Sequence, residues 1–124
     1  MNITQGLIAS QSYLDALPEV VARVVNGCGP GGWKVDLIPD TVLGLSIEEA
    51  CNIHDWDYTE GSTGYDKCIA DDRFLLNCLF LIENAKGFWA IIFRHHRKLR
   101  AYEYHLAVSS FGHDAFWKGK EKRI

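Results

Sequence analysis

Two short segments of the chain carry residue types that can bind a cation and move a proton. The first is a glycine-rich turn over residues 27–32. The second holds His54 and Asp55 as neighbours, with Cys51 three residues before the histidine. Ca²⁺ takes about six to eight oxygen ligands, often backbone carbonyls together with a carboxylate. The turn can present carbonyls because glycine adopts dihedral angles that other residues avoid, and Asp55 can complete the shell.

His54 is the residue of the second segment that can act as a general base. A neutral imidazole accepts a proton on one ring nitrogen, and its other nitrogen needs an acceptor that fixes the tautomer and stabilises the imidazolium. Asp71 or Asp72 can be that acceptor if their segment packs antiparallel to the segment of His54. A cation at Asp55 would then lie beside His54, where it could polarise an ester carbonyl while His54 activates a water.

A helix is expected over residues 47–59, and it would position His54 and Asp55. Ser46 is a good N-cap, and Glu49 three residues later completes a capping box. Within this helix Cys51, His54 and Tyr58 follow the spacing i, i+3 and i+7, so they share one face.

The other elements are also expected to be helical. Apolar residues at three- and four-residue steps predict a helix over residues 12–25. After the glycine-containing loop 61–64, Asp66 can cap a helix that ends near Asn84, and the short loop favours antiparallel packing against the helix of His54. Gly87 separates it from a last helix over residues 88–110, which Gly112 ends. The pattern contains no alternating strand of useful length, so the predicted class is all-α: a small helical domain with two antiparallel core helices that carry the site.

Length and composition agree with one globular domain over residues 1–124. The chain has 48% hydrophobic and 23% charged residues, which is not the composition of a disordered protein. Its net charge of −3 does not favour nucleic acid as a partner. Residues 94–100 and 118–123 are basic, however, and could touch an anionic surface such as lipid headgroups. The alternative is a solvated helix face and a frayed chain end.

The chain resembles the phospholipase A2 superfamily, of the bacterial and viral type. Residues 28–32 are similar to its calcium loop (C-G-x-G-G), and residues 51–58 are similar to its active-site helix (C-x-x-H-D-x-x-Y). Residues 70–74 look like the A-D-x-x-F segment of the bacterial and viral branches. The match covers residues 26–78, and the order of the motifs, the cysteine placement and Tyr58 four residues after His54 all agree.

This resemblance implies calcium-dependent hydrolysis of the sn-2 ester of a glycerophospholipid at a membrane or micelle surface. His54 would be the general base that deprotonates the attacking water, Asp71 would orient it, and Tyr58 would hydrogen-bond Asp71. The amide of Gly29 would stabilise the oxyanion together with the calcium ion. The implied calcium ligands are the Asp55 carboxylate and the carbonyls of Gly27, Gly29 and Gly31.

The resemblance also implies a disulfide between Cys28 and Cys51. The chain departs from the animal secreted members, which are disulfide-dense, because it has only four cysteines and carries Asp57 where they have another cysteine. Its connection over residues 33–45 is also longer. Cys68 and Cys78 lie ten residues apart, about 15 Å in one continuous helix and too far to bridge. They are expected to be buried thiols unless Cys68 lies before the helix or the helix breaks.

Two other functions fit the same residues. One is a catalytically silent module on the same fold that binds calcium and a membrane or protein partner. The other is a zinc site built from Cys28, Cys51, His54 and one more cysteine.

The expected compartment follows from the same features. A disulfide and a low-affinity calcium site favour an oxidising, calcium-rich setting, so the protein is expected to be secreted or virion-associated. Residues 1–10 do not resemble a signal peptide, and the apolar run 88–93 is too short to cross a bilayer, so delivery by another route is expected.

Overall fold

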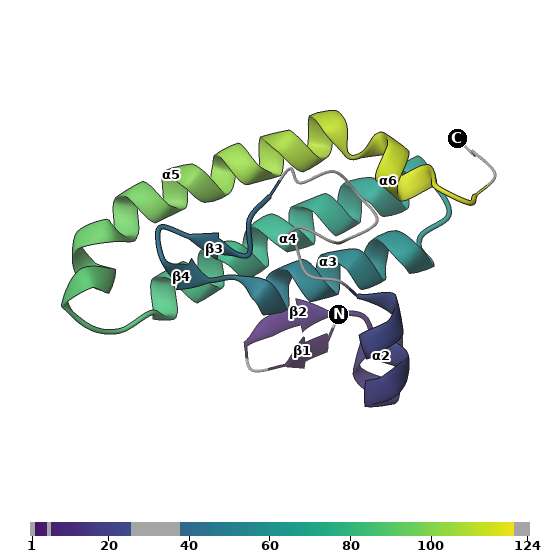
Figure 1. Ribbon diagram of the computed structural model, residues 1–124, viewed down its shortest axis with the longest axis horizontal. Coiled ribbons are helices and arrows are strands. Elements are labelled where there is room, and N and C mark those ends of the chain that lie inside the picture. Colours follow the sequence, from purple (N-terminus) through teal and green to yellow (C-terminus); the bar gives the residue numbers. More distant parts are fainter. Residues whose placement is uncertain (1, 5, 26–37, 121–124) are drawn as a thin grey trace.

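The computed structural model describes residues 2–4, 6–25 and 38–120, and it is mostly helical, with 73% helix. Three long helices, α3 (Glu48–Glu60), α4 (Gly64–Asn84) and α5 (Phe88–Phe111), lie side by side with α4 in the middle (Figure 1). The predicted all-α class and the antiparallel packing of α3 against α4 are therefore confirmed. Within the described ranges, no helix combines the length and the apolarity needed to cross a bilayer.

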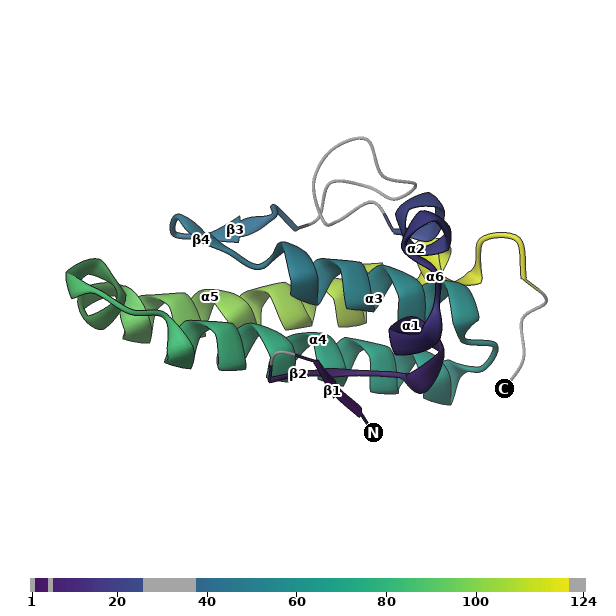
Figure 2. The same ribbon diagram turned by 90° about the horizontal axis from the view of Figure 1, so that it is seen from below.

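The N-terminal segment differs from the single helix expected over residues 12–25. It begins with a hairpin of β1 (Asn2–Thr4) and β2 (Leu7–Ala9), followed by two short helices, α1 (Gln11–Asp15) and α2 (Pro18–Val24). Ala16 and Leu17 between these helices are extended, with ψ of 146° and 145°. Pro18 accounts for the extended backbone of Leu17, because proline disfavours helical dihedrals in the residue before it and is well suited to a first helical position. Figure 2 shows β2 running along α4 and α2 lying beside α3.

The capping box expected at Ser46 is wrong. A second hairpin, β3 (Thr41–Val42) and β4 (Leu45–Ser46), leads into α3, and Ser46 pairs with Thr41 in it. The N-cap of α3 is Ile47, which has no side-chain cap. Strand pairing fixes the backbone of Ser46 outside the helix, and the carboxylate of Glu49 instead accepts a hydrogen bond of 2.6 Å from the Tyr13 hydroxyl.

The cap expected for the next helix also differs, because it lies three residues earlier than Asp66. Thr63, not Asp66, is the N-cap of α4, and the Asp66 side chain accepts hydrogen bonds from the Thr63 and Ser62 amides. The Thr63 and Asp66 side chains thereby form a reciprocal capping box, so α4 starts at Gly64. The expected bounds of α5 are confirmed within one residue, with Gly112 as its C-cap, and α6 (His113–Trp117) follows.

Cys68 and Cys78 both lie in the unbroken helix α4, and both are free thiols. The expectation that they do not bridge is confirmed, because one straight helix holds them too far apart. Cys78 is buried as expected, and burial raises the pKa of its thiol to about 12. Cys68 is exposed, so it was wrong to expect both thiols to be buried.

The main core lies where α3, α4, α5 and the β3–β4 hairpin meet. Its fully buried members include Ile47, Phe74, Cys78 and Ile82. A second cluster joins β2 to Ile53 of α3, and a third packs Phe116 of α6 against Tyr58. Both sides of α3 are thereby covered, and seven of its residues are buried. This coverage fixes the rotation of α3 and so the direction in which His54 points.

Gly112 offers a test of the close contact between α5, α6 and α3. A methyl group at this position would lie 2.5 Å from both the Tyr58 hydroxyl and the Val108 carbonyl. Gly112→Ala should therefore lower the free energy of unfolding by about 1–3 kcal/mol, measured by chemical denaturation. Gly64→Ala is the control, because no atom lies within 4 Å of the place that its methyl group would occupy, and it should be neutral or stabilising by up to about 1 kcal/mol. Equal losses in both variants would contradict the packing described here.

Candidate active site

His54 lies in the middle of α3 and contacts Asp71 of α4. The two atoms are His54 Nε2 and Asp71 Oδ1, 2.9 Å apart, and both side chains are about 95% buried. A carboxylate only accepts hydrogen bonds, so in the neutral imidazole Nε2 carries the hydrogen. The lone pair is then on Nδ1, the nitrogen that does not face Asp71. His54 is thus held in the tautomer that can accept a proton on Nδ1.

Asp71 receives two further hydrogen bonds, so its carboxylate is bound by three donors. The Tyr58 hydroxyl donates to Oδ1 at 2.7 Å, and the Lys67 ammonium donates to Oδ2 at 2.8 Å. Burial by itself would raise the pKa of Asp71, but the hydrogen bond and charge of His54, followed by the hydrogen bonds from Lys67 and Tyr58, hold that pKa below its usual value. Asp71 therefore stays ionised and can stabilise a positive charge on His54.

The imidazole is also in contact with two aromatic rings. The ring centroid of His54 lies 4.2 Å from that of Tyr58 and 4.9 Å from that of Phe74. Burial and the neighbouring Asp71 raise the pKa of Tyr58 far above its usual value, so its hydroxyl remains a donor. The Cys51, His54 and Tyr58 face predicted from spacing is confirmed as a buried face of α3.

Asp72, the alternative partner for His54, lies elsewhere. Its side chain is 71% exposed and contacts His105 of α5, with Oδ1 3.0 Å from His105 Nε2. One residue along a helix turns a side chain by more than a quarter turn, so α4 can direct only one of the two aspartates at α3. The structure brings Asp71, and not Asp72, to His54.

Lys67 is a member of this cluster that sequence reasoning missed. It is 4% exposed, and its ammonium donates to Asp71 and, at 3.0 Å, to the Val108 carbonyl of α5. The available signal was its i, i+4 spacing from Asp71. That spacing is equally typical of a surface ion pair, so only the packing of α5 over α4 reveals that the lysine is buried.

Asp55 is the one predicted calcium ligand within the described residues. Its side chain is buried, at 1% exposure, directly beside His54 in the chain. A carboxylate suits a hard cation, so Asp55 fits the implied metal. Gly27, Gly29 and Gly31 lie outside the described residues, as does Cys28, and the calcium shell and the Cys28–Cys51 pairing remain predictions. Among the residues that are described, no three His, Cys, Asp or Glu side chains group to hold a metal ion.

Asp57, which stands where the animal enzymes of the resembled family carry a cysteine, makes an ion pair instead. Its Oδ1 accepts from Arg73 Nη1 of α4 at 2.8 Å, and both side chains are largely buried. Burial raises the pKa of Asp57, although the Arg73 charge opposes this effect. An ion pair therefore joins α3 to α4 close to the site.

The basic segment 94–100 does not form one free cationic patch. Arg94 and Lys98 pair with Glu83, and Arg100 pairs with Glu103. Arg97 is buried and donates to the Leu43 carbonyl. In the second basic segment, the Lys120 ammonium donates to the Tyr58 carbonyl and lies 3.8 Å from the centre of the Phe116 ring. Contact with an anionic surface stays a prediction.

Removing the Lys67 ammonium should show how much the fold depends on it. Lys67→Met leaves Asp71 buried with one donor fewer and should lower the free energy of unfolding by about 3–5 kcal/mol in chemical denaturation. Lys86→Met is the control because Lys86 is not buried, and it should change the stability by no more than about 0.5 kcal/mol. A Lys67→Met protein as stable as the control would mean that the ion pair does not matter.

The pH dependence of stability should identify Asp71. Its pKa is lower in the folded protein than in the unfolded chain. Its stabilising contribution is therefore complete above the unfolded pKa of about 3.9 and is lost as pH falls through the folded pKa. Denaturation between about pH 7 and pH 3 should give a flatter decline for Asp71→Asn than for wild type, while the control Asp72→Asn keeps the wild-type decline. A wild-type decline in Asp71→Asn would refute the assignment.

No protein-family model, no curated protein and no solved structure matches this chain. The likeness to the phospholipase A2 superfamily therefore depends on the motif residues themselves and on the contacts of His54, Asp71 and Tyr58.

Proposed function

We propose that this protein is a calcium-dependent phospholipase A2 that hydrolyses the sn-2 ester of glycerophospholipids at a membrane or micelle surface. The observation that carries the proposal is the buried pair of His54 and Asp71, joined at 2.9 Å through Nε2. This contact is the one that the resemblance requires of its base and orienting aspartate. The Tyr58 hydrogen bond to the same carboxylate is the second contact it requires.

The proposed chemistry starts at Nδ1 of His54. This nitrogen takes a proton from a water as the water oxygen attacks the sn-2 carbonyl carbon. The resulting imidazolium is stabilised by Asp71, which the three donors keep ionised and in place. When the tetrahedral intermediate collapses, the ester C–O bond breaks and the imidazolium returns its proton to the leaving alkoxide. The products are a fatty acid and a lysophospholipid.

Asp55 and the carbonyls of Gly27, Gly29 and Gly31 would hold the calcium ion. When bound there, calcium supplies positive charge next to the ester carbonyl and its developing oxyanion. The amide of Gly29 is proposed as the second donor to that oxygen. Asp55 supports this part of the proposal, since a buried carboxylate beside the base is a suitable anchor for the ion.

One observation favours the catalytically silent alternative. The Lys67 ammonium already offsets the charge of Asp71, at 2.8 Å. A carboxylate that shares its charge with a lysine stabilises a neighbouring imidazolium less than an unshared one does. A module that binds calcium and a membrane or protein partner without turnover is therefore the second candidate.

The proposal is tested by fatty acid release from mixed phospholipid vesicles, with calcium and with excess chelator. Wild type should release the sn-2 chain only with calcium. His54→Gln should lower the rate by at least about a hundredfold, because the general base is removed. His96→Gln is the matched control, since His96 is exposed on α5, and it should keep the wild-type rate.

Two results would overturn the proposal in different ways. Calcium binding without any release of fatty acid would favour the silent binding module. Release that persists in His54→Gln or in chelator would place the activity at another site.

A further inference from the structure

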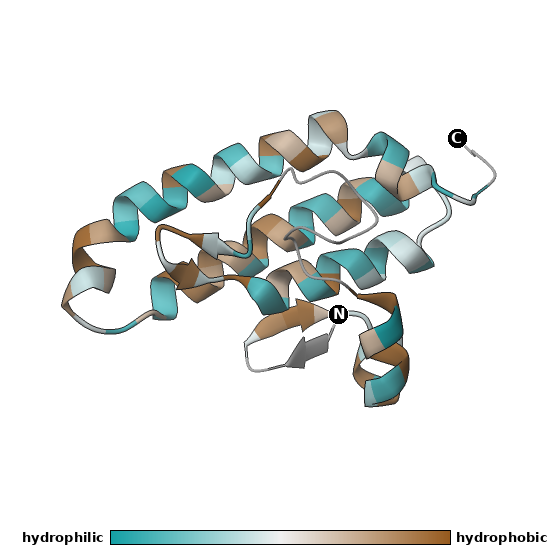
Figure 3. Cartoon of the chain, in the orientation of Figure 1, coloured by the Kyte–Doolittle hydropathy of each residue, from teal (hydrophilic) through white to brown (hydrophobic). Residues whose placement is uncertain are grey.

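The outer face of α5 carries a regular row of exposed apolar side chains. Of the twelve large hydrophobic residues exposed in the described part of the chain, eight belong to α5. Figure 3 shows apolar residues at the start of α5 and again along its length. Six exposed residues follow each other at alternating steps of four and three, and we call them the α5 seam: Phe88, Ile92, His95, Leu99, Tyr102 and Leu106.

Within the described residues, the α5 seam takes no part in the core of the single chain. The buried residues of α5 lie about half a turn away, on the face that packs against α4 and β3: Ala90, Arg97, Ala101, Tyr104 and Val108. Leu99, Tyr102 and Leu106 keep 51%, 53% and 65% of their surface exposed. The helix therefore has one face that holds the core and a second, opposite apolar face that nothing in the described residues covers.

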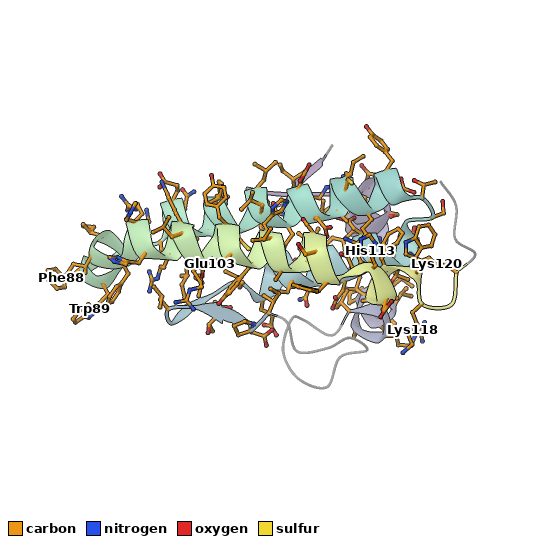
Figure 4. The ribbon with its side chains drawn as sticks, turned by 90° about the horizontal axis from the view of Figure 1, so that it is seen from above. Phe88, Trp89, Glu103, His113, Lys118 and Lys120 are labelled. Carbon is orange, nitrogen blue, oxygen red and sulfur yellow. The ribbon has the colours of Figure 1, made fainter. Side chains whose placement is uncertain are left out.

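The spacing indicates what kind of surface covers this face. Steps of four and three average 3.5 residues, which is the repeat of the a and d positions in paired helices. Charged residues flank the row closely, with Lys98 on one side and Glu103 on the other. The first turn is wider, because Trp89 and Ile91 are also exposed there. Figure 4 shows Trp89 projecting with Phe88 from the end of α5. A narrow apolar row with charged edges suits another helix better than a lipid surface.

We infer that this protein forms a dimer in which the α5 seam packs in parallel against the same seam of a second copy. With the seam at a and d, Lys98 occupies position g and Glu103 position e. A parallel pair brings g of one helix to e five residues further along the other, so Lys98 faces Glu103 of the partner subunit. Both side chains now make exposed pairs within the chain, with Glu83 and Arg100, and such surface pairs exchange at little cost.

This inference does not depend on the proposed function. The seam lies on the side of α5 that faces away from α4, and α3 with His54 lies on the other side of α4 (Figure 1). Pairing therefore leaves the candidate site uncovered. The seam spans about 27 Å, or two and a half heptads, so the association is expected to be weak and to vary with protein concentration.

Sedimentation equilibrium of the full chain, over a range of concentrations, tests the dimer. Wild type should show a reversible monomer–dimer equilibrium. Leu99→Glu puts a charge into the seam and should weaken dimerisation by at least about tenfold. Leu76→Glu is the matched control, because Leu76 lies on α4 and is 50% exposed, against 51% for Leu99. It should leave the equilibrium unchanged.

Two further variants complete the test. One should strengthen the dimer, and the other shows whether the two α5 helices are parallel or antiparallel. His95→Leu replaces the polar residue of the row by one that packs well at position d, so it should strengthen dimerisation several-fold. In a Cys68→Ser background, Leu106→Cys should form a disulfide between subunits on mild oxidation, because parallel pairing places the two positions opposite each other. Antiparallel pairing would place Leu106 near Phe88 of the partner subunit and would give no such disulfide.

Several outcomes would overturn the inference. A wild-type chain that stays monomeric at every concentration would do so, as would equal effects of Leu99→Glu and Leu76→Glu. Absence of the Leu106→Cys disulfide in a protein that does dimerise would reject the parallel arrangement. A monomeric protein that binds anionic phospholipid vesicles through Leu99 would show that the seam contacts lipid.

Discussion

The buried carboxylate of Asp71 is the group on which the centre of this structure depends. Its donors come from α3, through His54 and Tyr58, and from α4, through Lys67. Lys67 also donates to the Val108 carbonyl, so the same cluster reaches α5. An ion removed from water is tolerated only when its partners are all in place. The three long helices must therefore adopt one relative position, and the rings of Tyr58 and Phe74 then fix the imidazole.

The same constraint determines what His54 can do. Because Asp71 is ionised, it fixes the hydrogen on Nε2 and leaves Nδ1 as the basic nitrogen. Because Lys67 shares the charge of Asp71, the stabilisation of an imidazolium is weaker than an unshared carboxylate would give. Lys67 thus contributes to the stability of the buried cluster and, in the proposed reaction, shares the carboxylate that faces His54.

The two opposite faces of α5 have different roles in this structure. Its inner face, with Ala101, Tyr104 and Val108, completes the core and holds the Lys67 ammonium. Its outer face carries the α5 seam, which stabilises nothing within the described part of the chain. In the proposed dimer, α5 packs on both of its faces, and the side of α3 that carries the candidate site stays uncovered.

The sequence alone determined the elements whose signals are local. Glycines at 87 and 112 bound α5, helical periodicity predicted α3 and α4, and the motif spacing placed His54 and Tyr58 on one face, with Asp71 or Asp72 as the partner of the histidine. Two local predictions were wrong because another local signal competed with them. Pro18 divides the helix expected over residues 12–25, and strand pairing keeps Ser46 out of α3. The burial of Lys67, the exposure of Cys68 and the choice of Asp71 over Asp72 were decided by tertiary structure. Each depends on which helix packs over a given face, and a local pattern does not contain that information.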